Sequence, residues 1–526
     1  MPNIKILDCT LRDGGYNNSW RFGQNCIKSV ISGLVEAKMD FIECGYLSNK
    51  YEYQKDSTIY RYISDVNSFL VDIIQNSNYI VMINYGEYRV EDIPLCKTGK
   101  IKGLRVAFHK KDMVEAIAFC KSLKEKGYLV FVQPMVSLSY TDEEFVKLIQ
   151  AVNKIDPYAF YIVDSFGIMK RNDLTRLFYI VDHNLNQGIN IGYHSHNNLQ
   201  LAYSNAQMMA DFNTNRSIII DASVYGMGRG AGNLNTELFV EHLNDIHGTD
   251  YSIKPLLSII DNYLSDFFQQ NSWGYSLPNY LSAKHNAHPN YATYLDEKKT
   301  LTYEAIDEIF ALMKNNKKNS FDKNYIELLY TKYLERGNAQ ESNLSNLLIR
   351  LRSKTILLIA PGKSSFDERD KISEFINREH PIVISVNFDY SECSADFIFL
   401  SNLRRFSNLE INRKRCSIVT SNIPAVDAYA KIKYSSLLNN QDAVQDNAGL
   451  MLIKFLIQSQ VKKIYLAGMD GYSVDSSQNY MDKMLTIYTN KAHAEAMNYG
   501  MNQVLSEFSR QIDIKFLTTP RFITLL

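Results

Sequence analysis

The sequence lacks a CxxC pair, a long uncharged apolar run and a net charge, and each absence excludes a class of protein. Its seven cysteines are scattered and odd in number, which argues against a disulfide framework and against a structural zinc site. No apolar stretch reaches the roughly 18 residues of a membrane helix. Lys plus Arg equals Asp plus Glu at 57 each, so no overall charge attracts nucleic acid or anionic lipid.

These absences favour a cytoplasmic protein that binds neither nucleic acid nor a membrane and whose charged ligands are small molecules held by local groups. Cys9, Cys44 and Cys120 stand in apolar surroundings and are expected to be buried thiols. The length of 526 residues predicts two or three domains.

What the sequence does contain, over its first half, is β-rich runs that alternate with amphipathic stretches. Near-continuous apolar strands flanked by helices predict a parallel sheet covered on both faces. Eight such units fit a (β/α)8 TIM barrel of about 250 residues, whereas a doubly wound open sheet more commonly has five or six strands. The eight expected strands fall at 3–10, 40–47, 79–86, 102–110, 128–135, 160–167, 190–197 and 217–226.

Beyond the barrel the pattern changes twice. Residues 251–350 carry helical patterns interrupted by a turn-rich insert at 275–295, and we expect them to form a helical lid or linker. Strand signals restart near 354, which predicts a Rossmann-like α/β domain over 351–526. The predicted organisation is therefore a TIM barrel over 1–250, a helical segment and a C-terminal α/β domain.

Two of the ten histidines, His194 and His196, stand one residue apart at the end of the seventh expected strand. Alternate residues of a strand share a face, so both imidazoles would point to the mouth of the barrel, where enzymes of this fold hold their chemistry. Such a pair can bind one metal ion, although an HxH pair alone is weak evidence for a metal site.

Other polar residues follow the ends of other expected strands and strengthen this hypothesis. Asp13, an anionic candidate for a third ligand, follows Arg12 in a glycine-flanked loop after the first strand. A neutral oxygen ligand, Asn233, lies in the glycine-rich loop after the eighth strand. The remaining candidates at the same mouth are Glu43, Asp164, Ser165 and Arg229.

The motifs LDCTLRDGGY, IECGY, DSFG, YHSHNN and GMGRGAGN, in this order, resemble the HMG-CoA-lyase-like (DRE-TIM) metallolyases, and most closely the 4-hydroxy-2-oxovalerate aldolase-like proteins. The resemblance covers about residues 1–300. It implies that Asp13, His194, His196 and Asn233 are metal ligands. It also implies that Arg12 holds an enolate oxygen, that Ser165 helps to bind the substrate carboxylate and that Glu43 supports the site.

This resemblance implies an aldolase or lyase that makes or breaks a carbon–carbon bond next to a 2-oxo acid, pyruvate-like on one side, with an aldehyde as the other substrate. A divalent ion stabilises the negative charge that such a reaction places on oxygen. Mixed nitrogen and oxygen ligands suit Mn²⁺ or Mg²⁺, with Co²⁺ or Zn²⁺ by substitution. We also expect a homo-oligomer.

Other functions stay open at this point. Two histidines and a carboxylate also form the facial triad of non-haem iron oxygenases, but those are usually jelly-roll proteins. A Claisen-type synthase would need contacts for coenzyme A, and no basic cluster near the barrel mouth provides them. A pseudo-enzyme is disfavoured because the ligand set is intact.

The sequence departs from the aldolase pattern where a catalytic histidine normally follows the RDG motif. Tyr16 stands in this loop, and a phenol near pKa 10 is a poor base at pH 7. The alternatives are His285 and His288, which follow the barrel on the helical segment. Arg229 is a candidate for binding a second anionic group of the substrate.

In the C-terminal domain, a strand runs into a turn at Gly362, Lys363 and Ser364. The turn is no Walker P-loop, because Leu357 stands where that motif needs glycine. A strand, glycine and helix in series can still bind phosphate. A nucleotide or nucleotide-sugar site around this turn, Asn387 and Asp470 would make the chain a bifunctional enzyme of surface-polysaccharide synthesis; the alternative is a purely structural domain.

Overall fold

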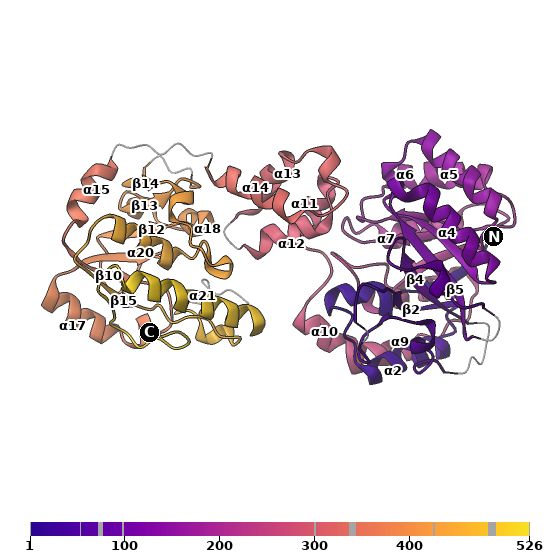
Figure 1. Cartoon of the computed structure of the whole chain (residues 1–526), viewed down its shortest axis with the longest axis horizontal. Helices are drawn as coiled ribbons and strands as arrows, with labels where there is room; N and C mark the ends of the chain where they lie inside the picture. The colour runs from indigo at the N-terminus through magenta and orange to yellow at the C-terminus, as the bar shows by residue number, and fades with distance from the viewer. Residues whose placement is uncertain are drawn as a thin grey trace. The chain divides into compact units, whose positions relative to one another are not determined.

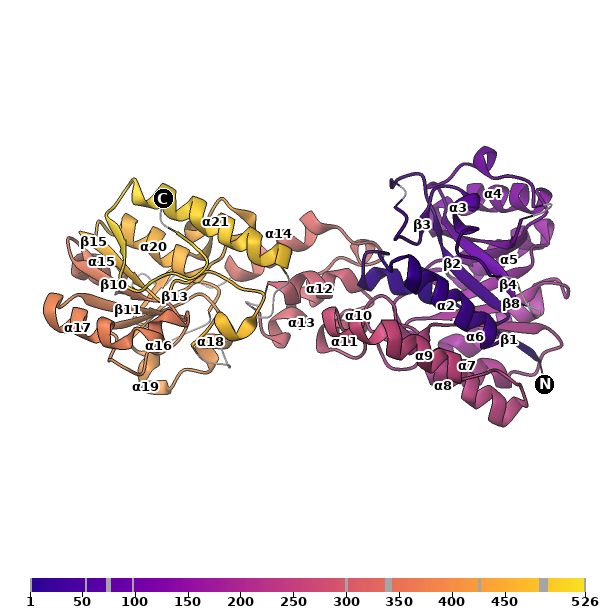
Figure 2. The ribbon, with the colours of Figure 1, turned by 90° about the horizontal axis from the view of Figure 1, so that it is seen from below.

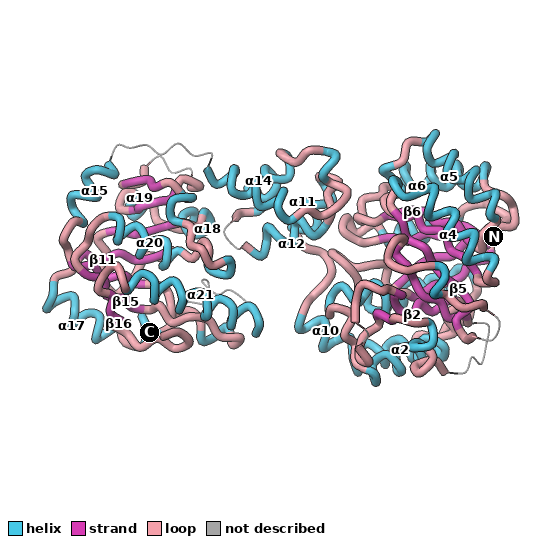
Figure 3. The backbone as a smooth tube through the Cα atoms, viewed as in Figure 1, coloured by secondary structure: helices cyan, strands magenta, loops and turns pink. Residues whose placement is uncertain are grey.

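The computed structural model describes residues 2–52, 54–71, 77–96, 99–298, 301–335, 343–423, 427–481 and 491–524. The chain forms two compact units, Met1–Thr293 with Lys314–Phe321, and Tyr294–Met313 with Asp322–Leu526. In each unit the strands lie inside and helices surround them (Figure 3). No helix in the described ranges has the length and apolar character that crossing a membrane requires.

The first unit is a TIM barrel, as the sequence predicts (Figure 1). All strand pairings are parallel, and the sheet closes where Leu7 and Asp8 pair with Phe41 and Ile42. The two-residue strand β3 (Ile59–Tyr60) adds to the edge of β2. The eight barrel strands are β1 (Asn3–Asp8), β2 (Phe41–Leu47), β4 (Asn78–Asn84), β5 (Ile101–Phe108), β6 (Leu129–Pro134), β7 (Ala159–Asp164), β8 (Asn190–Ser195) and β9 (Ser217–Ala222).

Amphipathic helices cover the outside of the barrel. One of them, α5, begins with a capping box between Thr141 and Glu144 and buries the apolar side of its helix against the strands. After the last strand, α9 (Lys254–Ile259) packs along α2 (Figure 2). The covering helices are α2 (Gln24–Glu36), α4 (Met113–Glu125), α5 (Asp142–Ile155), α6 (Arg171–Asn184), α7 (Ala202–Asp211) and α8 (Thr236–His242).

The interior of the barrel changes from apolar to polar along the strands. Leu7, Phe41, Ile80, Phe131, Tyr161 and Ile219 belong to one buried apolar cluster inside it. Glu43 lies two residues after Phe41 on β2, and Asp221 lies two residues after Ile219 on β9. Because alternate residues of a strand share a face, these carboxylates stand above the apolar layer, toward the carboxyl ends of the strands.

The turn-rich insert at 275–295 is largely helical. Ser276 caps α11 (Leu277–Lys284) by accepting a hydrogen bond from the Asn279 amide, and Pro289 opens α12 (Pro289–Glu297). Proline at a helix start lacks only an N–H that has no partner within the helix, so proline occurs at helix starts as well as in turns. The helices that follow are α13 (Tyr303–Ala311), α14 (Lys323–Glu335) and α15 (Leu344–Leu351).

The second unit contains a parallel sheet in the order β14-β13-β12-β11-β10-β15-β16. Starting at β10, the chain adds β11 to β14 in turn on one side of this strand, and then adds β15 and β16 on its other side. The topological switch point therefore lies between β10 and β15. Helix α20 (Ala448–Gln458) is mostly buried. The strands are β10 (Thr355–Ile359), β11 (Ile382–Val386), β12 (Phe397–Leu400), β13 (Ser417–Thr420), β14 (Ala430–Ile432), β15 (Lys463–Ala467) and β16 (Ile514–Phe516).

Candidate active site

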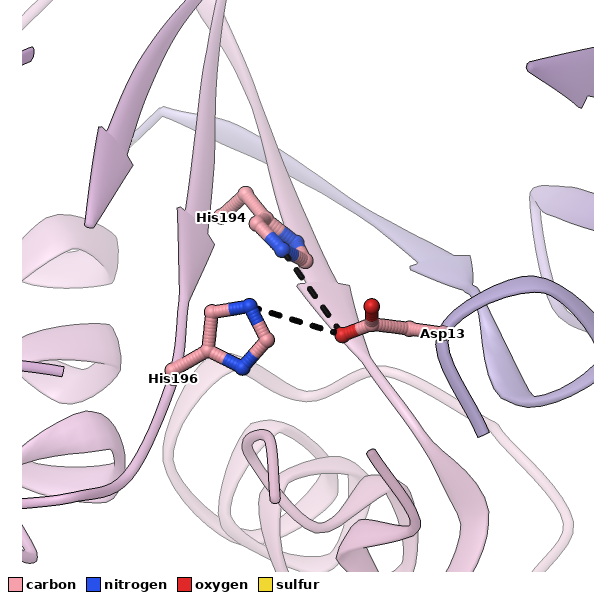
Figure 4. A group of neighbouring side chains, drawn as sticks. All are labelled: Asp13, His194 and His196. Atoms are coloured by element: carbon pink, nitrogen blue, oxygen red, sulfur yellow. Dashed lines mark ion pairs between the residues drawn. The ribbon is translucent and has the colours of Figure 1, made fainter. Parts of the chain in front are cut away.

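Asp13, His194 and His196 meet at the carboxyl ends of β1 and β8 (Figure 4). Their candidate ligand atoms lie within 4.8 Å of one another, and all three side chains are buried. Asp13 Oδ2 is 3.9 Å from His194 Nε2 and 3.7 Å from His196 Nε2. One carboxylate oxygen and two imidazole nitrogens thus point to a common centre, the arrangement that a divalent cation needs.

The protonation states of this group match those of metal ligands. Burial lowers the pKa of His196 to about 3, so its imidazole is neutral. Burial alone would raise the pKa of Asp13, but the positive charge of Arg12 outweighs it with the help of His196 and His194, and the pKa stays well below its usual range. A neutral imidazole and an ionised carboxylate are the forms that bind a metal.

Asp221, which lies on β9, contacts the ring nitrogen of His194 that does not face Asp13. His194 Nδ1 lies 2.9 Å from Asp221 Oδ2. In the tautomer that donates this hydrogen bond, Nε2 carries the free lone pair and faces Asp13.

Arg12 links Asp13 to Glu43. Its Nη1 donates to Asp13 Oδ1 at 2.7 Å and its Nε donates to Glu43 Oε2 at 2.8 Å. Asp13 Oδ2 stays available toward the histidines, and the buried Nη2 of Arg12 has no hydrogen-bond partner among the described residues. Arg12 therefore orients one ligand and keeps a donor for a further group at the site.

Asn233 places a fourth candidate ligand atom, its amide oxygen, in the same region. His196 and Asn233 form an isolated antiparallel bridge, and Asn233 donates its Nδ2 to the Met227 carbonyl at 3.2 Å. Its buried Oδ1 accepts no hydrogen bond within the described part of the chain. A buried acceptor without a partner is costly, and a cation would satisfy it.

The remaining candidates at the barrel mouth have local partners. Asp164 accepts hydrogen bonds from the amides of Ile168 and Met169, both at 2.9 Å, and burial raises its pKa to about 6. Ser165 Oγ accepts a hydrogen bond from the Val136 amide at 2.8 Å. Both side chains thus shape the loops that follow β7 and β6.

Arg229 connects the barrel mouth to the helices that follow the barrel. Its guanidinium lies 5.3 Å from the ring centroid of Tyr16, donates to the Ser165 carbonyl at 2.9 Å and approaches His288 Nε2 to 3.4 Å. Burial, and then the charge of Arg229, lower the pKa of His288 well below its usual value. His285 stands at the end of α11. His288 is therefore observed against a candidate site residue.

Sequence reasoning missed two residues of this cluster, Arg105 and Asp221. Arg105 lies in the middle of β5 and is completely buried, and it donates to both Glu43 and Asp221. The one available signal was charge inside an otherwise apolar strand, in GLRVAF and IIIDA. Three carboxylates, those of Asp13, Glu43 and Asp221, are in direct contact with two guanidinium groups, those of Arg12 and Arg105.

The second unit contains a cavity of about 600 Å³ at the carboxyl ends of its strands. Gly362, Asn387 and Asp470 line it, as does the start of α20. Ser364 is buried and already occupied: its amide donates to Asp470 Oδ2 at 2.7 Å and its hydroxyl to Asp470 Oδ1 at 2.5 Å. Lys363 donates to the Ser477 carbonyl at 3.3 Å. A phosphate at the Ser364 amide would therefore have to displace a carboxylate.

Several known proteins are similar to part of this chain. The sequence profile of the HMGL-like family matches residues 100–258. The 4-hydroxy-2-oxovalerate aldolase of Pelotomaculum thermopropionicum is 27% identical over 248 residues, which are 46% of this chain and 70% of the relative. The protein of that name from Carboxydothermus hydrogenoformans is 28% identical over 245 residues, 45% of this chain and 69% of the relative.

Among solved structures, the N-terminal domain of a putative aldolase from Bacteroides vulgatus is similar over its whole length. It is 30% identical, with a TM-score of 0.51, and the match covers 59% of this chain and 100% of that domain.

Proposed function

The chain belongs to the HMGL-like family, and from this premise we propose that its barrel is a divalent-metal-dependent aldolase or lyase that forms or cleaves a carbon–carbon bond next to a 2-oxo acid. The observation that carries the proposal is the convergence of Asp13, His194 and His196, with the unsatisfied Oδ1 of Asn233 beside His196. The names of the 4-hydroxy-2-oxovalerate aldolase relatives support a pyruvate-like fragment and an aldehyde as the substrate classes.

In the cleavage direction, the electron pair of the broken bond moves onto the 2-oxo fragment, whose carbonyl oxygen becomes negative. A bound divalent ion supplies Lewis acidity at that oxygen. Arg12 offers its unpartnered Nη2 to the same charge, in a buried site where a fixed donor is worth more than in water. Mn²⁺ and Mg²⁺ are the proposed ions, with Co²⁺ and Zn²⁺ as substitutes.

A base must take the proton of the substrate hydroxyl in cleavage and a methyl proton of pyruvate in exchange, and His288 is the proposed group for both. It is neutral because its pKa is lowered, and its Nε2 faces Arg229 at the mouth of the barrel. Tyr16 packs beneath the same guanidinium and is proposed to help position it.

The test is exchange of the methyl protons of pyruvate with solvent deuterium, followed by NMR with Mn²⁺ under anaerobic conditions. Exchange requires carbanion formation next to the carbonyl and needs no knowledge of the aldehyde. We expect exchange by the wild type and at least a hundredfold loss in Asp13→Asn and His194→Ala, together with weaker Mn²⁺ binding. Asp211→Asn is the matched control for Asp13→Asn. Asp211 is the last residue of α7, and this change removes an exposed carboxylate that lies near His247. Absence of exchange with all four ions, or unchanged exchange in Asp13→Asn, would refute the proposal.

A second activity, in the C-terminal unit, is supported by the position of its cavity. Ligands of doubly wound sheets bind outside the carboxyl ends of the strands at the switch point, and this cavity is lined by residues that follow β10, β11, β12 and β15. The proposed ligand is a nucleotide or nucleotide sugar. Carboxylates outnumber cations in the described lining, so the ligand is expected to bind with Mg²⁺.

Calorimetric titration of the full chain with CTP, UTP and their sugar conjugates, in the presence of MgCl₂, tests this activity. Gln445→Trp would fill the cavity and abolish the heat, whereas Gln458→Trp, at the exposed end of α20, would not. No heat from any of these nucleotides would reject the nucleotide class.

A further inference from the structure

Arg105 stands below the candidate metal centre, inside the barrel, and its side chain is completely inaccessible to solvent. Its Nη1 donates to Glu43 Oε2 at 3.0 Å, and its Nη2 donates to Asp221 Oδ2 at 2.5 Å. The guanidinium also lies over the ring of Tyr161, 4.8 Å from the centroid. Two carboxylates and one aromatic ring thus fix a single cation.

Each of these carboxylates has a second partner at the site. The oxygen of Glu43 that binds Arg105 also accepts from Arg12 Nε, and Arg12 holds Asp13. The oxygen of Asp221 that binds Arg105 also contacts His194 Nδ1. Arg105 therefore stands in the middle of a continuous chain of contacts that begins at one candidate ligand, Asp13, and ends at another, His194.

The chemistry of this position favours arginine. Its planar guanidinium presents donors in a fixed fork, so it can hold two carboxylates at a set separation, whereas a lysine ammonium on a flexible stem cannot. Without Arg105, Glu43 and Asp221 would be two like charges in a closed interior. Each would relax toward another donor and take Arg12 or His194 with it.

We propose that Arg105 is a positioning residue that fixes the geometry of the metal ligands from both sides, through Asp221 to His194 and through Glu43 and Arg12 to Asp13. This inference rests on the proposed function, because it takes Asp13 and His194 as metal ligands. Groups behind the direct ligands commonly change metal affinity by about 10–100-fold when they are substituted.

A purely structural role is the alternative, and the barrel contains a control for it. Arg216 is also buried, pairs with Asp182 at 3.0 Å and donates to the Ile189 carbonyl at 3.1 Å. It directly precedes β9, at the amino ends of the strands, opposite the candidate site. Arg216→Lys removes comparable buried bonds without touching the metal ligands.

The experiment measures Mn²⁺ affinity of the full-length protein by electron paramagnetic resonance, and thermal unfolding of the barrel by tryptophan fluorescence, because both tryptophans, Trp20 and Trp273, lie in the first unit. We expect Arg105→Lys to bind Mn²⁺ about 10–100-fold more weakly and Arg216→Lys to bind within twofold of the wild type. Both variants are expected to melt at lower temperature. Affinity of Arg105→Lys within twofold of the wild type would overturn the proposal.

A second comparison works even if Arg105→Lys does not fold. If Glu43 and Asp221 communicate through Arg105, the effects of E43Q and D221N on Mn²⁺ affinity are not independent, and the double variant loses at least threefold less affinity than the product of the single losses. Independent effects would reject the coupling. Failure of pyruvate exchange in a wild type that binds Mn²⁺ would refute the proposed reaction and leave the role of Arg105 intact.

Discussion

Gly192 lies directly against the ring of Tyr161, so close that a methyl group on its α-carbon would stand 2.3 Å from a ring carbon. Gly192 is two residues before His194 on β8, and Tyr161 is the ring that supports Arg105. The absence of a side chain at one interior position thus makes room for the aromatic ring beneath the polar cluster.

Gly192→Ala is therefore expected to destabilise the barrel by about 1–3 kcal/mol, because the methyl group must displace a closely packed ring. The measurement is urea unfolding followed by tryptophan fluorescence. Gly188→Ala, for which no atom lies within 4 Å of the added methyl group, is the control and is expected to change stability by less than about 0.5 kcal/mol. Equal free energies of unfolding for the two variants would show that the ring of Tyr161 accommodates the methyl group without loss of stability.

Asn233→Ala is expected to weaken Mn²⁺ binding by about tenfold or more while the barrel stays folded, because it removes the buried Oδ1, which accepts no hydrogen bond from any residue that the structure describes. Electron paramagnetic resonance of free Mn²⁺ gives the affinity. Asn190→Ala, at the opposite end of β8 from the candidate metal ligands, serves as the control. Unchanged affinity in Asn233→Ala would remove the amide from the ligand set.

His288→Gln is expected to slow pyruvate exchange by about 10²–10⁴-fold with unchanged Mn²⁺ affinity, because a proton-transfer group acts on the substrate and not on the ion. Burial and the charge of Arg229 lower the pKa of His288 and so favour its neutral imidazole, the form that can accept a proton. His285→Gln is the matched substitution. If it slows exchange more than His288→Gln does, the assignment of the two histidines is reversed.

Asp8 gives a prediction for stability against pH. It is fully buried, accepts hydrogen bonds from the Thr10 amide at 3.0 Å and the Thr236 hydroxyl at 2.7 Å, and burial raises its pKa from 3.8 to about 6. Because the folded pKa is the higher one, the group stabilises the fold fully below pH 3.8 and loses that contribution as pH rises through about 6.

Asp8→Asn lacks this titration. Between pH 5 and 8 the wild type is therefore expected to lose about 1 kcal/mol of barrel stability relative to Asp8→Asn. Tryptophan-detected unfolding of both proteins across this range checks the difference. A difference in free energy of unfolding between the two proteins that stays constant from pH 5 to 8 would contradict the raised pKa of Asp8.

Much of the fold could be predicted because parallel strands are buried on both faces and leave a simple signature. All eight barrel strands were expected where they occur, and β10 was expected from its apolar run. Strand β14 was missed, since only Ala430–Ile432 are in it and such a short run has no pattern of its own. The starts of the two helices within 275–295 could not be placed from the sequence, because proline and asparagine occur both at turns and at helix starts.

The sequence by itself determined which residues stand at the carboxyl ends of the barrel strands, because strand periodicity fixes which side chains face the mouth. On that ground, together with the family resemblance, it was possible to name Asp13, His194, His196 and Asn233. Only the tertiary structure decided that Arg105 and Asp221 lie beside them. These two residues lie 116 positions apart, and their meeting depends on the closure of the barrel around its axis, which no local pattern encodes. Electrostatics then selects the partners, because a charge buried in that interior is stable only beside its opposite.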